Sequence, residues 1–182
     1  MKSHYFQVGK ILACVLLIVL MTSLVLSQPK KGLYGITMAI SKGFIHSNNI
    51  STNSGSLNIG FAYFPSDRIS VRCDVGFRAQ KDTSEAKTSE FTFTGNMWYY
   101  LQTSENVSTF LGGALGFGSA TDATGKGSSL MSLQGFFGAE YWLSQHFSWF
   151  GHIGLVYASY TISERPASDV FTSASTGLTW YF

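Results

Sequence analysis

Residues 69–80, with the sequence ISVRCDVGFRAQ, alternate between apolar and polar side chains along their whole length. The odd-numbered positions hold Ile, Val, Cys, Val, Phe and Ala, whereas the even-numbered positions hold Ser, Arg, Asp, Gly, Arg and Gln. Successive side chains of a β-strand point to opposite faces of a sheet, so this spacing predicts a strand with one apolar and one charged face. One such strand fits a soluble sheet as well as a membrane barrel.

The same alternation recurs along the chain to its end. It predicts eight strands, at residues 33–43, 54–65, 69–80, 89–101, 107–119, 128–143, 147–160 and 172–182. Small residues crowd one face of several strands, as at Gly112, Gly116 and Gly118, and small side chains suit the narrow interior of a closed barrel. Most of these segments are long enough to cross a bilayer as tilted strands, which takes about 9–11 residues.

The connections between the predicted strands alternate in length. Short connections span residues 65–68, 102–106 and 144–146, and longer polar ones span 44–53, 81–88, 120–127 and 161–171. Tight turns on one side and longer loops on the other are typical of a barrel inserted from the periplasm. We therefore expect the short turns and both chain ends in the periplasm, and the four longer loops outside the cell.

Residues 1–27 have the pattern of a secretory signal peptide. Lys2, His4 and Lys10 form a basic start, residues 11–26 form an apolar run, and Ser27 precedes the expected cleavage point. We expect residues 1–27 to be removed and residues 28–182 to form one outer-membrane β-barrel domain. The alternative is an uncleaved membrane helix, but the apolar run of 16 residues is shorter than the about 20 residues that a span needs.

The composition indicates an integral membrane protein. Only 12% of the residues are charged, about half the usual share. Lys2 and Lys10 lie in the signal segment, which leaves ten basic and ten acidic residues in the remainder. No basic patch carries interleaved aromatic residues, so we expect no nucleic-acid partner. Cys73 is the one cysteine outside the signal segment, and the histidines are scattered, so we expect neither an intramolecular disulfide nor a metal site.

Aromatic residues gather near the ends of the predicted strands. They occur at residues 98–100, 141–142, 147–149 and 180–182. Tyr and Trp favour the headgroup level of a bilayer, so we interpret these groups as girdles at the membrane interfaces. The alternative is the core of a soluble β-sandwich, which would leave the signal segment and the low charge unexplained.

The last predicted strand, with SASTGLTWYF at residues 173–182, resembles the carboxy-terminal signature of outer-membrane barrels. Phe182 ends the chain, and Trp180 and Leu178 precede it at alternating positions. Residues 28–182 as a whole resemble the small OmpA/OmpX-type barrels of Gram-negative bacteria. The resemblance implies an all-β, eight-stranded, antiparallel, up-and-down transmembrane β-barrel in the cell outer membrane. It also implies contact with outer-membrane lipids, insertion by the barrel assembly machinery that reads this signature, and a barrel without the peptidoglycan-binding domain of full OmpA-type proteins.

Charged residues fall on the inner face of the predicted barrel. They are Arg72, Asp74, Arg78, Glu90 and Glu140, with Gln134 and His152 on the same face. Unpaired charge in a narrow lumen is costly, so we expect these groups to pair. Because eight strands enclose a space that side chains nearly fill, we predict a charge network that plugs the lumen. The alternative is a narrow, porin-like pore in which these charges control ion passage.

We expect no enzymatic activity and no cofactor. Some eight-stranded barrels modify lipid A, and such a deacylase needs a His, a Ser and a carboxylate at the lipid-facing rim. Here His152 points inward by parity, His146 lies in a short turn and His46 lies in an outer loop. The sequence therefore predicts a structural or surface-interaction role, in adhesion or membrane integrity, with the outer loops open to an extracellular partner.

Overall fold

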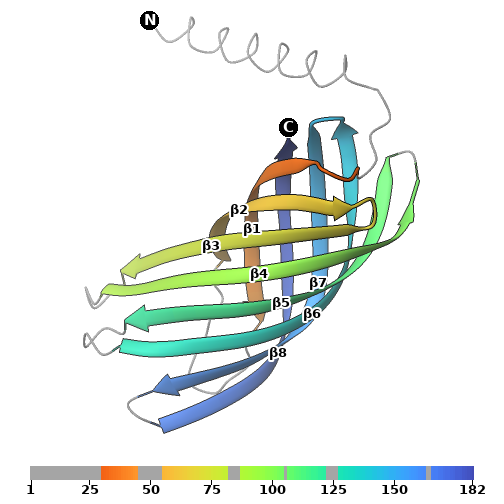
Figure 1. Ribbon diagram of the computed structural model, residues 1–182. Helices are drawn as coiled ribbons and strands as arrows, with labels where there is room; N and C mark the ends of the chain where they lie inside the picture. The colour runs from red at the N-terminus through yellow and green to blue at the C-terminus, as the bar shows by residue number, and fades with distance from the viewer. Residues whose placement is uncertain (1–29, 45–54, 82–86, 105, 122–126, 163–164) are drawn as a thin grey trace, which may run out of the picture.

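The chain forms one closed barrel of antiparallel strands (Figure 1). The computed structural model describes residues 30–44, 55–81, 87–104, 106–121, 127–162 and 165–182. The strands are β1 (Tyr34–Phe44), β2 (Gly55–Ser66), β3 (Ile69–Lys81), β4 (Lys87–Thr103), β5 (Val107–Thr121), β6 (Gly127–Ser144), β7 (Phe147–Ile162) and β8 (Arg165–Tyr181). Each strand pairs with the next, and β1 closes the barrel on β8. The predicted fold is confirmed. The expected signal peptide lies outside the described residues.

The alternation of residues 69–80 becomes the two faces of β3. Val71 and Phe77 point outward and are 42% and 62% exposed, whereas Arg72 points inward and is 1% exposed. Cys73 is exposed as well, as its odd position predicts. The inward face of a strand in a closed barrel meets only the other inward faces, so each polar side chain there must find a partner in the lumen.

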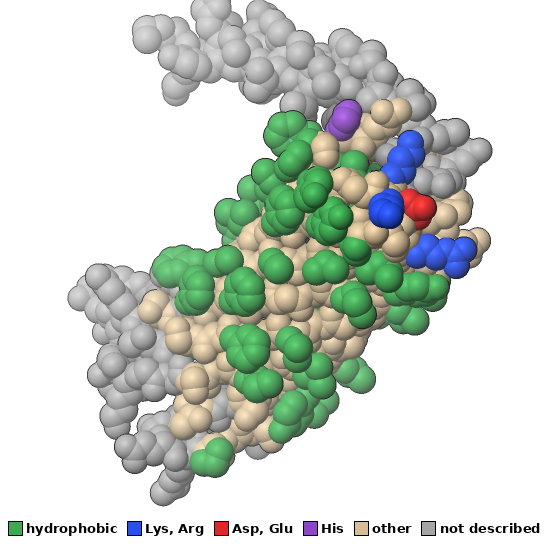
Figure 2. All heavy atoms as spheres, viewed as in Figure 1, with side chains coloured by type: hydrophobic (Ala, Val, Ile, Leu, Met, Phe, Trp, Pro, Cys, Tyr) green, Lys and Arg blue, Asp and Glu red, His purple; other side chains and the backbone are tan. Residues whose placement is uncertain are grey.

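Large apolar side chains are exposed on the outside of the barrel, and Figure 2 shows them spread over one face. Ile40, Leu133 and Ile153, on three different strands, are 59%, 56% and 63% exposed. An apolar surface that encircles a barrel is stable against lipid, not against water. The described residues include no helix that is both long and apolar enough to cross a membrane.

The prediction of an aromatic girdle is wrong for four of the residues assigned to it. The exceptions point into the lumen and are at most 2% exposed: Trp98, Tyr100, Trp142 and Tyr181. Other aromatic residues of the same groups point outward and are 42–59% exposed: Tyr99, Tyr141, Trp149, Trp180 and Phe182. Adjacent residues of a strand face opposite sides, so a run of consecutive aromatic residues divides between the lipid and the lumen.

The longer loop predicted at residues 161–171 is also wrong. β7 and β8 extend through it as a hairpin, with Thr161 opposite Pro166 and Ile162 opposite Arg165. The segment is polar and contains a proline, both typical of loops, but a proline is tolerated near the first residue of a strand. The strand ends on either side of the three other predicted loops lie within a few residues of their predicted places.

Candidate functional site

An ion pair between β3 and β6 crosses the barrel lumen. Arg72 Nη2 lies 3.3 Å from Glu140 Oε1, and the two side chains are 1% and 0% exposed. Both residues occupy inward positions, because they are buried while the adjacent Val71 and Tyr141 are each 42% exposed. Removing either partner would leave an isolated charge in a space without water contact.

Three hydroxyl groups from three other strands donate to the Glu140 carboxylate. Tyr100 Oη donates to Oε2 at 2.5 Å, Tyr181 Oη donates to Oε1 at 2.7 Å, and Ser148 Oγ donates to Oε1 at 2.5 Å. Together with the Arg72 guanidinium, these donors occupy both carboxylate oxygens. A buried carboxylate is tolerated under these conditions, because hydrogen bonds replace the water it has lost.

The Arg72 guanidinium has hydrogen-bond and aromatic partners in addition to Glu140. Nε donates to Ser70 Oγ at 3.3 Å, and Nη1 donates to Thr179 Oγ1 at 3.2 Å. The guanidinium carbon lies 3.5 Å from the ring centre of Trp98 and 5.2 Å from that of Phe150. This stacking is a cation–π contact, which is strongest when both groups are out of water.

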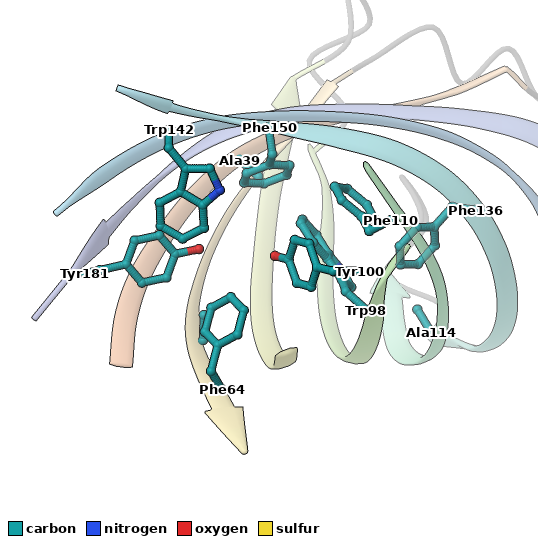
Figure 3. Packing of buried hydrophobic residues seen from close by; sticks show 11 residues of the cluster. Ala39, Phe64, Trp98, Tyr100, Phe110, Ala114, Phe136, Trp142, Phe150 and Tyr181 are labelled. Atoms are coloured by element: carbon teal, nitrogen blue, oxygen red, sulfur yellow. The ribbon is translucent and has the colours of Figure 1, made fainter. Parts of the chain in front are cut away.

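Aromatic side chains pack in the lumen toward the short-turn ends of the strands, and Figure 3 shows the buried cluster to which they belong. Phe64 packs against Tyr100 and Tyr181 with ring centres 5.5 Å and 5.9 Å apart, and Trp142 stacks on Tyr181 at 4.9 Å. In Figure 3 the hydroxyl groups of Tyr100 and Tyr181 point toward the centre of the lumen. We call Arg72, Glu140, Tyr100, Tyr181 and Phe64 the lumen seal; each is at most 1% exposed.

Glycines on the wall make room for the large rings. A Cβ added at Gly112 of β5 would overlap the Phe136 ring, and one at Gly177 of β8 would lie 2.7 Å from the ring of Phe150. The glycines on the inward face, attributed above to a narrow interior, therefore accommodate particular aromatic side chains.

A cavity of about 220 Å³, lined by both polar and apolar side chains, lies beyond the seal, toward the long-connection ends of the strands. Arg72, Trp98 and Phe150 form its floor, and Asp74 and His152 lie in its wall. Asp74 Oδ2 accepts a hydrogen bond from Asn96 Nδ2 at 2.5 Å. The lumen is thus closed in one half and hollow in the other.

The predicted charge network divides into three parts. Arg72 and Glu140 are brought together in the seal, and Asp74 lies in the cavity wall. Arg78 and Glu90 are opposite each other in the register of β3 and β4, but their side chains lie outside the described part of the chain. Within the described residues, no three His, Cys, Asp or Glu side chains form a group suited to a metal ion.

Several residues that contact Arg72 or Glu140 were not among the predicted site residues. They are Tyr100, Tyr181, Ser70, Ser148, Thr179 and Trp98. The alternation of side chains along each strand could have identified them. Each of these residues either shares the inward face of its strand with a residue assigned to the lumen or lies between two outward residues.

The three residues of the expected assembly signature point outward. Leu178, Trp180 and Phe182 are 42%, 59% and 59% exposed, while Thr179 and Tyr181 between them are fully buried. The signature therefore presents one apolar row to the outside at the junction between β8 and β1, where the barrel closes.

No protein-family model matches the sequence, and no curated protein matches it. Solved structures do share its fold. The N-terminal β-barrel domain of Pseudomonas aeruginosa OprF is 13% identical, with a TM-score of 0.57 over 84% of this chain and 98% of that one. Neisserial surface protein A is 15% identical, with a TM-score of 0.55 over 82% and 95%. The outer membrane protein OprG from Pseudomonas aeruginosa is 15% identical, with a TM-score of 0.54 over 87% and 99%.

These similarities establish the fold. The chain is an eight-stranded barrel of the small outer-membrane type. The backbone hydrogen bonds between its strands form a closed ring, and its outer surface is apolar, which suits a membrane-spanning position. The outer membrane is the location that this fold and surface indicate.

Proposed function

We propose that this protein is a sealed, non-enzymatic barrel that contributes to the integrity of the outer membrane and presents its longer connections to the surroundings of the cell. The observation that carries the proposal is the lumen seal. Arg72 and Glu140 lie across the lumen with exposures of 1% and 0%, and Tyr100, Tyr181 and Phe64 around them are fully buried. A hydrated ion has no path through a layer in which every side chain is out of contact with solvent.

A non-enzymatic role is supported by the placement of the histidines. The His152 ring stacks on Phe136 inside the lumen, with ring centres 4.5 Å apart. His146 lies beside the β6–β7 turn, where its Nδ1 is 3.1 Å from the carbonyl oxygen of Tyr181. Neither ring is placed beside a Ser and a carboxylate at the lipid-facing wall, as hydrolysis of a lipid ester would need. His46 lies outside the described residues.

Planar-bilayer recording tests the seal. We expect the purified protein to show no discrete conductance steps, and we expect the same of Arg68→Ala, which removes one positive charge at a short turn outside the lumen. Conductance steps that Arg72→Ala alters and Arg68→Ala leaves unchanged would contradict the seal and establish the alternative, a narrow pore controlled by lumen charges. The cavity beyond the seal is the observation that favours this alternative, because it already hollows half of the lumen.

Experiments in cells that lack the protein distinguish a role in membrane integrity from a role in surface interaction. Loss of the protein should raise the sensitivity of the outer membrane to detergent, and a variant with residues 45–54 replaced by a Gly-Ser linker of equal length should restore resistance. If adhesion is the role, the same variant should restore resistance but lose attachment to host cells or matrix. Normal detergent resistance and attachment without the protein would contradict both parts of the proposal.

A further inference from the structure

Basic side chains gather at the short-turn end of the barrel. Lys30 and Lys31 precede β1, and Arg68 lies in the turn between β2 and β3; all three are exposed, and we call them the basic patch. Figure 2 shows basic side chains together at one end of the molecule, beside an acidic side chain, with hydrophobic side chains on the wall next to them. The other two short connections, residues 102–106 and 144–146, contain neither Lys nor Arg. The basic patch therefore belongs to one side of this end, formed by β1, β2 and β3.

Residues 30–33 form a turn that is fixed to the end of the barrel. Leu33 N donates to the carbonyl oxygen of Lys30 at 3.2 Å, and Gly32 has a φ of 86°, the positive value that a type II turn has at its third residue. Gly32 N donates to Phe64 O at 2.8 Å, and Phe64 N donates to Leu33 O at 3.0 Å. The Leu33 side chain packs against the buried cluster in the lumen. The two lysines are thus held at the rim of the barrel.

A hydrogen bond joins this turn to the turn that carries Arg68. Lys31 N donates to Asp67 Oδ1 at 2.7 Å. Asp67 and the carboxylate of Phe182, whose oxygen accepts from Tyr34 N at 3.4 Å, are the acidic groups beside the basic patch. Both accept backbone N–H groups, and neither forms an ion pair with a basic side chain in the described part of the chain. The charges of the basic patch are therefore available to an anion outside the protein.

Two outward tyrosines place the basic patch at the headgroup level of a bilayer. Tyr34 of β1 and Tyr63 of β2 are opposite each other in the register, and their rings stack with centres 4.7 Å apart. Phe61 continues this row toward the middle of the wall; it is 45% exposed, and its ring centre lies 5.8 Å from that of Tyr34. Tyr favours the boundary between headgroups and acyl chains. Residues 30–33, which come directly before Tyr34, then lie at the level of the lipid phosphates.

We propose that the basic patch binds anionic phospholipids in the leaflet on the short-turn side of the membrane, which is the periplasmic leaflet in the predicted topology. The patch attracts a headgroup of net negative charge, and Tyr34 and Tyr63 pack against the adjoining part of the lipid. Each basic residue near an anionic membrane surface strengthens binding about fivefold. Zwitterionic phospholipids carry no net charge, so the patch distinguishes the two classes of lipid. The site is independent of whether the lumen is sealed or conducting.

Backbone NMR of the folded, full barrel in lipid nanodiscs tests the proposal. The amide signals of Lys31 and Gly32 are followed while phosphatidylglycerol, of net charge −1, replaces phosphatidylcholine at constant total lipid. We expect saturable shifts, and the mole fraction of phosphatidylglycerol at half of the full shift measures the preference. Ser119 and Ser129, which are opposite each other near the long-connection end, should lack this response. Phosphatidylethanolamine in place of phosphatidylglycerol should not produce it either, because it carries no net charge.

Substitutions at the patch test the role of its charge. Arg68→Gln should weaken the preference about fivefold, Arg68→Lys should retain it, and Lys30→Gln/Lys31→Gln/Arg68→Gln should abolish it. Lys126→Gln, the matched control, removes one positive charge from the connection between β5 and β6 at the opposite end and should leave the preference unchanged. Wild-type protein in 1 M NaCl, where the Debye length is about 3 Å, should also lose the preference, which tests the proposal without a substitution.

The same half-saturation in wild type and in the triple variant would overturn the proposal, as would equal shifts with phosphatidylethanolamine. Inorganic phosphate that produces the shifts in phosphatidylcholine nanodiscs would identify a site for phosphate alone. Purified peptidoglycan that binds wild type and not the triple variant, without any response to phosphatidylglycerol, would identify that polymer as the partner. Either of these two results would overturn the assignment to a lipid.

Discussion

Truncation of Glu140 should destabilise the barrel by stranding a buried positive charge. Glu140→Ala removes the carboxylate 3.3 Å from Arg72 and leaves a guanidinium that is 1% exposed. Removing one partner of a buried ion pair costs about 3–5 kcal/mol. Since about 1.4 kcal/mol changes an equilibrium tenfold, the ratio of folded to unfolded protein should fall by about two to four powers of ten.

A second substitution separates the stranded charge from the other losses. The hydroxyl groups of Tyr100, Tyr181 and Ser148 lose their acceptor in Glu140→Ala, and they lose it equally in Arg72→Met/Glu140→Ala. We therefore expect Arg72→Met to lower the free energy of unfolding in the wild-type background but to raise it in the Glu140→Ala background. Arg72→Met also removes the hydrogen bonds to Ser70 and Thr179, but it removes them in both backgrounds, and Met keeps an apolar chain against Trp98, so the difference between the backgrounds reports the charge.

Urea unfolding in phospholipid vesicles, followed by tryptophan fluorescence, measures both effects. The four proteins form a double-mutant cycle, and residues in contact show coupling energies of about 0.5–3 kcal/mol. If Arg72→Met lowers the stability by the same amount in both backgrounds, within about 0.5 kcal/mol, the two residues are not coupled and the account of the lumen seal is refuted.

Other substitutions test the packing, the assembly signature and the lipid face. Gly112→Ala should destabilise the barrel by about 1–3 kcal/mol, because the new Cβ would overlap Phe136, whereas Gly95→Ala, whose Cβ meets nothing within 4 Å, should leave its stability in urea unchanged or slightly raised. Phe182→Ser should reduce the fraction of protein that reaches its heat-modifiable, folded form in cells while the purified variant still folds in detergent; equal yields in cells would refute a role in assembly. Leu133→Arg, which places a charge on the outer wall near the middle of β6, should cost about 2–4 kcal/mol in vesicles, and a cost below about 0.5 kcal/mol would show that this position does not face lipid.

The strands could be predicted because each carries its own periodic pattern. Residues 69–80 show the two faces without reference to any other part of the chain, and the structure places them in β3 (Ile69–Lys81). The start of β8 could not be predicted in this way. Its first residues, around Pro166 and Asp169, are ordered by pairing with the end of β7, and their polar composition is that of a loop.

The seal could be predicted only in part. Parity placed Arg72 and Glu140 on the inward face, but their contact depends on the register of the strands between them, which is a property of the closed barrel. Tyr181 lies between Trp180 and Phe182 in the sequence, so its aromatic character suggested the membrane interface. Its hydroxyl group instead bonds to Glu140 in the lumen, because a strand divides consecutive residues between two environments.

A spin-label scan of residues 69–80 in lipid vesicles tests the central claim most directly. Each position is replaced in turn by a labelled cysteine in a Cys73→Ser background, with Cys73 itself labelled in the wild type, and the accessibility of the label to dissolved oxygen is measured. A barrel whose wall separates lipid from a sealed lumen predicts oxygen accessibility that peaks at residues 71, 73, 75 and 77 and falls at 70, 72, 74 and 76. Accessibility without a period of two, or with its peaks at the even positions, would contradict the account.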